Sequence, residues 1–262
     1  MGKFFTVTVR PELPIATLIA NDGTDKPFAA TDLFFDWAAF DIPKGAALLR
    51  HVTLLVRGED GAPNTARDFQ LYFAKSHSGG TAPSSLGTGN ATVDGTGYYQ
   101  QIIGAILLNA ADFRTNLDFG VSVVTTGYGG NTDQVPNMVL EGEHESGTNV
   151  GYDKIYVAGV GGASNTWDFS TGVLTTQAET ASASAAKTIT TDGTHATKAL
   201  QKGDVVAAAG PAGGSGSYKT VGTVTSVNST TSVTFDAIAE ALEDNDELVV
   251  INPITMILSF EK

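Results

Sequence analysis

The chain has 262 residues, a formal net charge of −13, 42% hydrophobic residues and no cysteine. This length and apolar content are sufficient for one large buried core or two smaller ones. Only 15 residues are Lys or Arg, and they are scattered, which argues against a nucleic-acid partner because phosphate neutralisation needs clustered cations. The absence of cysteine excludes disulfides and thiolate metal sites.

Thirty glycines and 16% charged residues favour strands joined by tight turns over helices. The composition therefore predicts an all-β protein. Met1–Val7 lacks the apolar segment and cleavage site of a signal peptide, and no run approaches the ~18 apolar residues of a membrane span. We expect synthesis in the cytoplasm and no membrane partner.

The N-terminal part of the chain predicts three strands before residue 45. Phe5, Val7 and Val9 alternate with threonines, which indicates a first strand. Residues 15–19 predict a short second strand, which ends at a turn over residues 21–25. The apolar and aromatic run over residues 33–40 predicts a third strand, and it leads into the segment around which we expect the fold to be organised.

That segment is a predicted hairpin over residues 46–75. Its first arm, residues 46–57, places Leu48, Val52, Leu54 and Val56 on one face, with Arg50 as the exception. The second arm, residues 69–75, places three apolar residues on one face in the same way. Gly, Asp, Pro and Asn lie between the arms, so we expect the two arms to pair antiparallel across a polar loop.

Beyond the predicted hairpin, residues 76–96 are rich in Gly, Ser, Thr and Pro and predict a long exposed loop. Asn109 followed by Asp112 resembles a helix N-cap, which predicts one short helix over residues 110–117. Further strands are predicted over residues 119–125, 135–140, 155–160 and 167–174.

The last third of the chain predicts a second unit. Residues 175–187 indicate a linker, and four short strands between residues 200 and 250 resemble a small barrel of the SH3 or OB type. Residues 254–261 alternate with one apolar face, which needs a core to cover it. We expect this final strand to rejoin the N-terminal sheet; the alternative is a plain C-terminal domain that keeps it.

Together these patterns predict an antiparallel β-sandwich, jelly-roll-like, with a small SH3/OB-like β-barrel inserted near the C-terminus. The main sandwich domain is predicted at residues 1–182, with residues 252–262 returning as its last strand. The small barrel is predicted at residues 187–251.

Few motifs in the sequence point to chemistry. Residues 159–164 approach a dinucleotide fingerprint, but the third glycine is missing and no helix follows, so a hairpin turn is the better interpretation. Glu141–Glu145 and Glu243–Glu247 gather carboxylates of the kind that hard cations prefer, yet each is more typical of a solvated edge. We therefore predict no catalytic, cofactor-binding or metal-binding residue, and no cofactor.

The histidines and aromatic residues also carry little functional signal. His51, His77, His144 and His195 lack the spacing of a zinc site or a catalytic triad. The candidates for a sugar-stacking platform are Trp37, Trp167, Tyr98, Tyr99 and Tyr128. Aromatic residues at strand positions are more often part of the core. Glycosidase carboxylates leave no local signature, so an enzyme of that kind stays open.

Two stretches, Lys44–Gly58 and Asp244–Ile254, resemble virion structural proteins of tailed bacteriophages, particularly those of marine phages. The resemblance carries no catalytic or binding residues. It implies a non-enzymatic structural protein, made in the host cytoplasm and present on the virion. Among such proteins, an acidic modular β protein is most similar to a capsid decoration or cement protein, often trimeric, whose partner is the major capsid protein.

Two other functions remain open at this stage. One is a phage tail component or receptor- or carbohydrate-binding module, which predicts glycan binding through exposed Trp or Tyr. The other is a glycan hydrolase, which predicts a cleft with paired carboxylates.

Overall fold

The computed structural model describes residues 2–58, 67–75, 82–94, 101–117, 121–127, 136–141, 152–162, 166–169, 187–193, 196–210 and 216–262. These residues are mostly strands, and the described helices are the short η1 (Ile15–Thr17), η2 (Ala110–Asp112) and α1 (Ala196–Ala199). No helix in these described ranges is long and apolar enough to cross a membrane.

Strands account for most of the described chain. They are β1 (Phe4–Val9), β2 (Leu33–Pro43), β3 (Ala47–Arg57), β4 (Phe69–Lys75), β5 (Ile102–Leu108), β6 (Arg114–Leu117), β7 (Val121–Thr125), β8 (Met138–Leu140), β9 (Tyr152–Gly161), β10 (Thr188–Thr190), β11 (Val205–Ala209), β12 (Lys219–Ser229), β13 (Ser232–Phe235), β14 (Glu247–Val250) and β15 (Ile254–Glu261).

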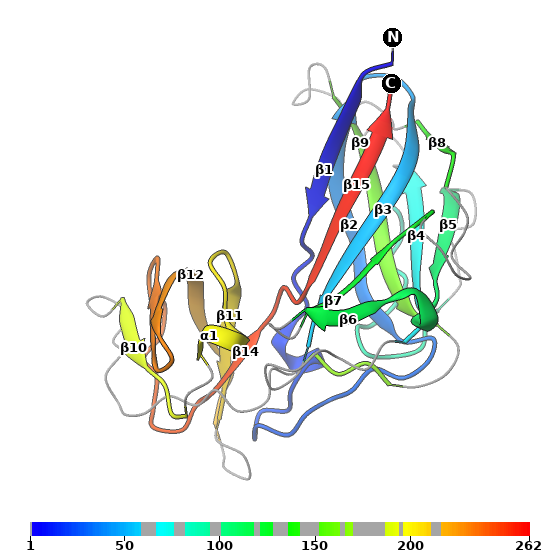
Figure 1. The fold of residues 1–262 in the computed structure, drawn as a ribbon. Coiled ribbons are helices and arrows are strands. Elements are labelled where there is room, and N and C mark those ends of the chain that lie inside the picture. The colour runs from blue at the N-terminus through cyan, green and yellow to red at the C-terminus, as the bar shows by residue number, and fades with distance from the viewer. Residues whose placement is uncertain are drawn as a thin grey trace.

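Two antiparallel sheets form a sandwich (Figure 1). The first sheet has the order β1-β15-β3-β7-β6, with β8 also paired to β3, and the second has the order β2-β9-β4-β5. Along the chain the strands pass between the sheets in the pattern of a jelly roll, with β1, β3, β7 and β15 in one sheet and β2, β4, β5 and β9 in the other. The predicted all-β sandwich is confirmed.

The core lies between these sheets and contains a group of aromatic side chains. The Trp167 ring stacks on Phe169 with 5.9 Å between centroids, and Phe34 and Phe69 meet it edge-on at 6.4 and 6.0 Å. Trp167 is 1% exposed. Each such ring removes about 150–250 Å² from water, so this group supplies a large part of the hydrophobic stabilisation.

The predicted pairing of residues 46–57 with residues 69–75 is wrong, although both segments are strands. β3 pairs with β15, β7 and β8, whereas β4 pairs with β5 and β9 in the opposite sheet. The two strands face each other across the core instead of lying edge to edge. An apolar face shows which side of a strand is buried, but not which strand lies beside it.

The exceptional position of Arg50 in the alternation of β3 has a structural cause. The register between β3 and β15 shifts at this point, because Ser259 pairs with His51 and Phe260 with Leu49. The extra residue is a β-bulge, which reverses the alternation on its N-terminal side. Leu49 is therefore fully buried, and Leu48, which the sequence pattern placed on the buried face, is not.

Three local predictions also need correction. Residues 15–17 form the 3₁₀ helix η1 instead of a strand, and the helix predicted at residues 110–117 is the single turn η2 followed by strand β6. The loop predicted as exposed is covered in part, since Leu86 is 2% exposed. In each case, contacts with the sandwich override a weak local signal.

Between β9 and β15 the chain forms a third antiparallel sheet, with the order β10-β13-β12-β11-β14. It has its own apolar cluster, which includes Val206, Val221, Phe235 and Leu248. Its edge strands β10 and β14 do not pair with each other within the described residues, so the predicted barrel is instead an open sheet. We call it the inserted sheet.

After the inserted sheet, β15 pairs with β1 on one side and with β3 on the other, which places the last strand beside the first. Figure 1 shows both chain ends at the end of the sandwich far from the inserted sheet. The predicted domain boundaries at residues 182, 187 and 251 stay predictions, and of the linker predicted over residues 175–187 only Lys187 lies within the described residues.

An ionic cluster joins the sandwich to the inserted sheet. Asp204 is 1% exposed; its Oδ1 lies 3.0 Å from Arg10 Nη2 and its Oδ2 lies 2.6 Å from Arg57 Nη2. Arg10 Nη1 also donates to the Gly203 carbonyl at 2.8 Å, and Arg57 Nη1 donates to the Ala199 carbonyl. Arg10 directly follows β1 and Arg57 is the last residue of β3, and both strands belong to the first sheet of the sandwich. The cluster therefore fixes the inserted sheet to that sheet.

Candidate functional site

The outer face of the second sheet carries a candidate binding pocket. On β4 the alternation directs Phe69, Leu71 and Phe73 into the core, and Gln70 and Tyr72 away from it. Tyr72 pairs with Ala158 of β9 and with Ala105 of β5. Because both neighbours are small alanines, the Tyr72 ring stands above them on this face.

The loop over residues 82–94 covers one end of this face. Leu86 and Val93 pack with Ala158 and Val160 of β9 and with Tyr72. Polar contacts fix the loop: Trp37 Nε1 donates to the Ser84 carbonyl at 2.9 Å, and the Leu86 amide donates to Asp36 Oδ1 at 3.2 Å.

Asn90 fixes the same loop from its other side. Its backbone has a φ of 54°, in the left-handed region that asparagine tolerates better than most residues. Its side-chain Nδ2 donates to the carbonyls of Thr17 and Lys26 at 2.9 and 3.0 Å. The loop is thus held at both ends of its path over the sheet.

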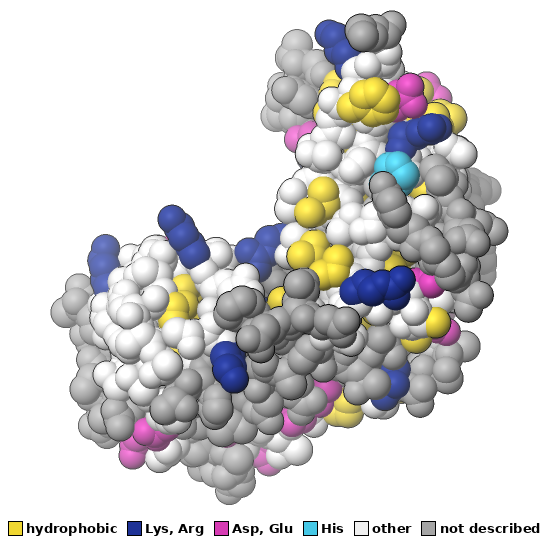
Figure 2. All heavy atoms as spheres, viewed as in Figure 1, with side chains coloured by type: hydrophobic (Ala, Val, Ile, Leu, Met, Phe, Trp, Pro, Cys, Tyr) yellow, Lys and Arg dark blue, Asp and Glu magenta, His cyan; other side chains and the backbone are white. Residues whose placement is uncertain are grey.

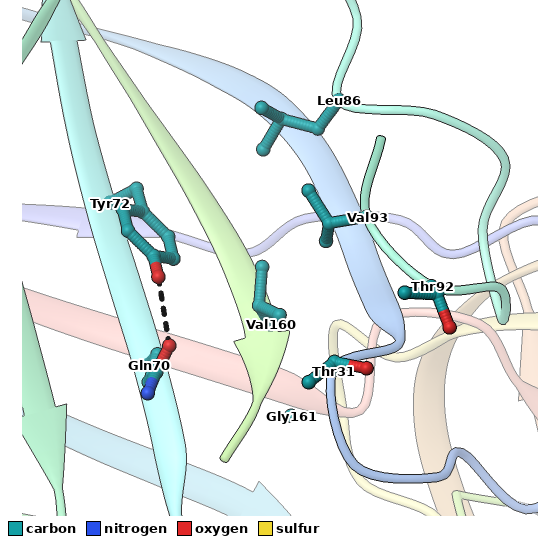
Figure 3. Close-up of a pocket in the computed structure, with 8 residues that line it drawn as sticks. All are labelled: Thr31, Gln70, Tyr72, Leu86, Thr92, Val93, Val160 and Gly161. Atoms are coloured by element: carbon teal, nitrogen blue, oxygen red, sulfur yellow. Dashed lines mark hydrogen bonds between the residues drawn. The ribbon is translucent and has the colours of Figure 1, made fainter. Parts of the chain in front are cut away.

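Between the loop and the sheet lies a pocket of about 370 Å³. Its lining, drawn in Figure 3, consists of Thr31, Gln70, Tyr72, Leu86, Thr92, Val93, Val160 and Gly161. Leu86, Val93 and Val160 supply an apolar wall beside the Tyr72 ring. A pocket of this size accommodates a small molecule such as a monosaccharide or disaccharide unit.

The polar groups of the pocket are arranged by a few contacts. The Tyr72 hydroxyl donates to Gln70 Oε1 at 2.8 Å, which orients the amide. Within the described residues, Gln70 Nε2 and the hydroxyls of Thr31 and Thr92 have no hydrogen-bond partner in the protein. The NH₂ group of Gln70 is therefore available to donate to a ligand, and each threonine hydroxyl can both donate and accept.

Thr31 adds backbone strain at the pocket edge. Its φ is 68°, in the left-handed region, which is unusual for a β-branched residue. Backbone hydrogen bonds hold it there, because its amide donates to the Gly161 carbonyl and its carbonyl accepts from the Val93 amide, both at 3.1 Å. Strain of this kind concentrates at ligand-binding sites.

The described lining of the pocket is uncharged. Asp, Glu, His, Lys and Arg are absent from the part of the lining that the structure describes. A hydrolase of the paired-carboxylate type needs two acids at the bond to be cleaved. An aromatic ring, an apolar wall and uncharged polar groups suit a neutral polyhydroxylated ligand, whose C–H face contacts the ring while its hydroxyls bond at the rim.

A second surface lies on the outer face of the first sheet, where register places uncharged residues of β1, β15, β3 and β7 in three consecutive rows, with Arg114 of β6 beside Val123 at the end of the third row. We call it the neutral face, and it consists of Thr6, Thr8, His51, Thr53, Leu55, Val123, Thr125, Thr255, Ile257 and Ser259. Figure 2 shows hydrophobic and uncharged side chains across its middle, with charged ones nearer its ends.

At one end the neutral face meets exposed apolar surface. Phe4, at the start of β1, is 75% exposed. It borders a depression of about 520 Å³ that Arg50 and His51 also line. The chain has 28 Asp and Glu side chains, yet the neutral face contains no carboxylate.

The acidic clusters considered from sequence are not free cation sites where the structure describes them. Asp246 is buried, and its Oδ2 accepts from Lys219 Nζ and from the Glu243 amide, both at 2.7 Å. Lys219 therefore pairs with Asp246 and Glu243 of the Glu243–Glu247 cluster. Glu141 is exposed, and residues 142–145 lie outside the described residues. Within the described ranges, no three acidic or histidine side chains are grouped as metal ligands.

The aromatic and histidine candidates fall in different places. Trp167 belongs to the core, and Trp37 is half-buried beside the loop that covers the pocket. His51 lies on the neutral face, where Nδ1 is 3.3 Å from the Thr126 carbonyl oxygen. The remaining candidates, His77, His144, His195, Tyr98, Tyr99 and Tyr128, lie outside the described residues.

The turn predicted at residues 159–164 is wrong for its first part, because Gly159 and Gly161 continue strand β9. A Cβ on Gly159 would lie 2.3 Å from Phe35 Cε1, so this glycine permits close packing of an aromatic ring on the strand. Gly161 lines the pocket.

Comparisons with known proteins add no relative: no family model matches the chain, and neither the curated proteins nor the solved structures include a significant match.

The sequence had placed Gln70 and Tyr72 on the outward face of a strand, but it gave no indication of the pocket. Thr31 and Thr92 come from distant segments, and only the folded chain brings them to β4.

Proposed function

We propose that this chain is a non-enzymatic virion structural protein of a tailed phage, a capsid decoration or cement protein that stabilises the head by bridging capsid subunits. The observation that supports it best is the neutral face. Protein interfaces are depleted in charged residues at their centre, and this face combines exposed threonines with Leu55, Val123 and Ile257.

The fold and the sequence support the same proposal. Jelly rolls are used by viral capsid domains, and also by lectin domains and cupins, so the fold is compatible with the proposal without selecting it. The stretch Lys44–Gly58, which resembles virion proteins, includes the whole of β3, and β3 lies at the centre of the first sheet. The proposed partner is the major capsid protein, and the proposed assembly on the capsid surface is a homotrimer.

A decoration protein acts through buried area and needs no chemistry. A standard stable interface buries about 800 Å² on each partner. A flat sheet face without carboxylates avoids the desolvation cost of buried charge and presents threonine hydroxyls that bond to a partner. On an acidic chain it also offers a sheet face where a second acidic surface meets little repulsion.

The test is cosedimentation with capsids that lack this protein. The purified chain is mixed with such capsids, and bound protein is measured against concentration. We expect saturable binding, and Thr8→Glu should reduce it strongly because it places a carboxylate on the neutral face. Thr225→Glu on β12 is the matched control, since that exposed threonine lies on the inserted sheet. Equal binding by both variants, or no binding by the unaltered chain, would contradict the proposal.

The pocket favours a second candidate function, that of a glycan-binding tail or receptor-binding component. Its Tyr72 ring and the unpartnered polar groups of Gln70, Thr31 and Thr92 support this alternative. A glycan array followed by titration of the best ligand tests it. Gln70→Leu should abolish binding, whereas Gln201→Leu, an exposed site away from the pocket, should leave it unchanged. An array without a positive glycan would remove this candidate.

A further inference from the structure

The corner between the sandwich and the inserted sheet holds more positive charge than its single carboxylate balances. Arg10 and Arg57 both contact Asp204, and among the described residues that line the pocket of about 250 Å³ beside them Asp204 is the single acid. Lys202 also lines this pocket and is exposed. Three cationic side chains thus face one carboxylate, in a chain whose net charge is −13.

The existing contacts of Asp204 leave it little capacity to balance a third cation. Its Oδ1 binds Arg10, and its Oδ2 binds both Arg57 and the Gln201 amide, the latter at 2.6 Å. Arg57 is 8% exposed, so its guanidinium is poorly screened by water. Burial is the main cause that lowers the pKa of Arg57, and the nearby charge of Arg10 lowers this pKa further, although Asp204 opposes both effects.

Donors also remain available at this corner. Arg10 Nε is buried and has no hydrogen-bond partner within the described residues. The Lys202 ammonium has no ion pair there either. Figure 2 shows basic side-chain atoms at the corner where the inserted sheet meets the sandwich. An oxyanion suits such donors, because charge-assisted hydrogen bonds from guanidinium and ammonium groups are the strong ones.

We propose that this corner pocket binds an oxyanion, a phosphate or carboxylate group, between Arg10, Arg57 and Lys202. The bound anion supplies the negative charge that Asp204 alone does not. Arg57 belongs to β3, and Lys202 lies in the turn that leads into β11 of the inserted sheet. The anion therefore also strengthens the attachment of the inserted sheet to β3. This site is independent of the proposed virion role, and the two proposals are tested separately.

The experiment is a titration of the ¹⁵N-labelled full chain with inorganic phosphate, followed in two-dimensional spectra at constant ionic strength. The Gln201, Gly203 and Asn252 amides should shift in a saturable way, and a parallel titration with acetate shows whether a carboxylate also binds. Chloride at equal ionic strength measures the contribution of screening alone. Absence of saturable shifts with both phosphate and acetate would overturn the proposal.

Two variants of Lys202 test the charge balance, and this residue is chosen because it makes none of the contacts that hold the corner together. Lys202→Gln should weaken phosphate binding roughly tenfold, as expected for the loss of one charge-assisted contact. Lys202→Glu should abolish binding and raise Tm by about 2 °C, because the new carboxylate occupies the place of the anion.

The control is Lys44→Glu, an exposed lysine of the turn between β2 and β3. It makes the same change in net charge on an already acidic chain, and we expect it to leave phosphate binding intact and not to raise Tm. If Lys202→Glu and Lys44→Glu behave alike, the corner carries no uncompensated positive charge and the proposal is wrong.

Discussion

Arg57 on β3 and Asp204 before β11 form an ion pair of 2.6 Å, and their side chains are 8% and 1% exposed. They are 147 residues apart in sequence, as their numbers show. Such a pair contributes little net stability compared with an apolar replacement, but removing one partner leaves a charge buried without its counterion. Its value here is therefore positional: it fixes where the inserted sheet lies.

Asp204→Ala should lower the free energy of unfolding by about 3–5 kcal/mol, since it leaves two guanidiniums facing each other. Chemical denaturation measures this change. Asp244→Ala, at an exposed position on the inserted sheet, is the matched control and should change the free energy by less than about 0.5 kcal/mol. Similar values for the two variants would show that the ion pair does not hold the junction.

Two glycines on the sandwich strands should differ in their tolerance of a methyl group. Gly159→Ala should lower the free energy of unfolding by about 1–3 kcal/mol, because its Cβ would lie 2.3 Å from the buried ring of Phe35. Gly104→Ala brings its Cβ equally close to Met138, but the flexible end of that side chain moves aside at lower cost. Thermal unfolding of both variants checks the order, and a larger loss for Gly104→Ala would contradict it.

The two tryptophans should have distinct fluorescence. Trp167 is 1% exposed within the aromatic core, whereas Trp37 is half-buried on the outer face of β2. In the Trp37→Phe variant, the remaining emission should be blue-shifted and resistant to quenching by acrylamide. Ready quenching in that variant would place Trp167 outside the core. Trp167→Ala should cost about 3–5 kcal/mol of stability.

Asp236 should make the inserted sheet sensitive to acid. Its Oδ1 accepts from the amides of Thr223 and Ala237, both at 2.8 Å, and the bond from Thr223 is the main cause that lowers the pKa of Asp236 below 3.8. Because the folded pKa is below the unfolded one, the contribution to stability is present above pH 3.8 and is lost as the pH falls through the folded pKa.

The measurement for Asp236 is an NMR titration of its carboxyl group, with thermal unfolding compared between neutral and acidic solution. Asp236→Asn should remove the part of the acid sensitivity that this carboxyl causes. A titration midpoint at or above 3.8 would contradict the prediction.

Local alternation was informative where one face of a strand is buried and no bulge interrupts its register. The pattern over residues 254–261 predicted a strand with Ile254, Met256, Leu258 and Phe260 facing a core, and all four are buried. The same holds for Phe69, Leu71 and Phe73 on β4. A period of two is imposed by the backbone itself, so it can be recognised without knowing the neighbours.

The pairing of strands was not accessible in the same way. β3 and β4 are adjacent in sequence and share an alternating pattern, yet they lie in opposite sheets. Any two strands with one apolar face satisfy the same burial requirement, either side by side or across a core. The choice depends on the whole set of strands, and above all on β15 taking the place between β1 and β3.

The features of the candidate site likewise fall into those that the sequence predicts and those that only folding creates. From the sequence alone come the all-β class, the segments that form strands, the outward position of Gln70 and Tyr72, and the absence of a local catalytic motif, because these follow from composition and backbone periodicity. The tertiary structure alone decided the pocket, the neutral face and the cationic corner. Each joins residues far apart in the chain, such as Thr31 with Thr92 or Arg10 with Lys202, and contacts at long sequence separation are set by packing of the entire chain rather than by any local pattern.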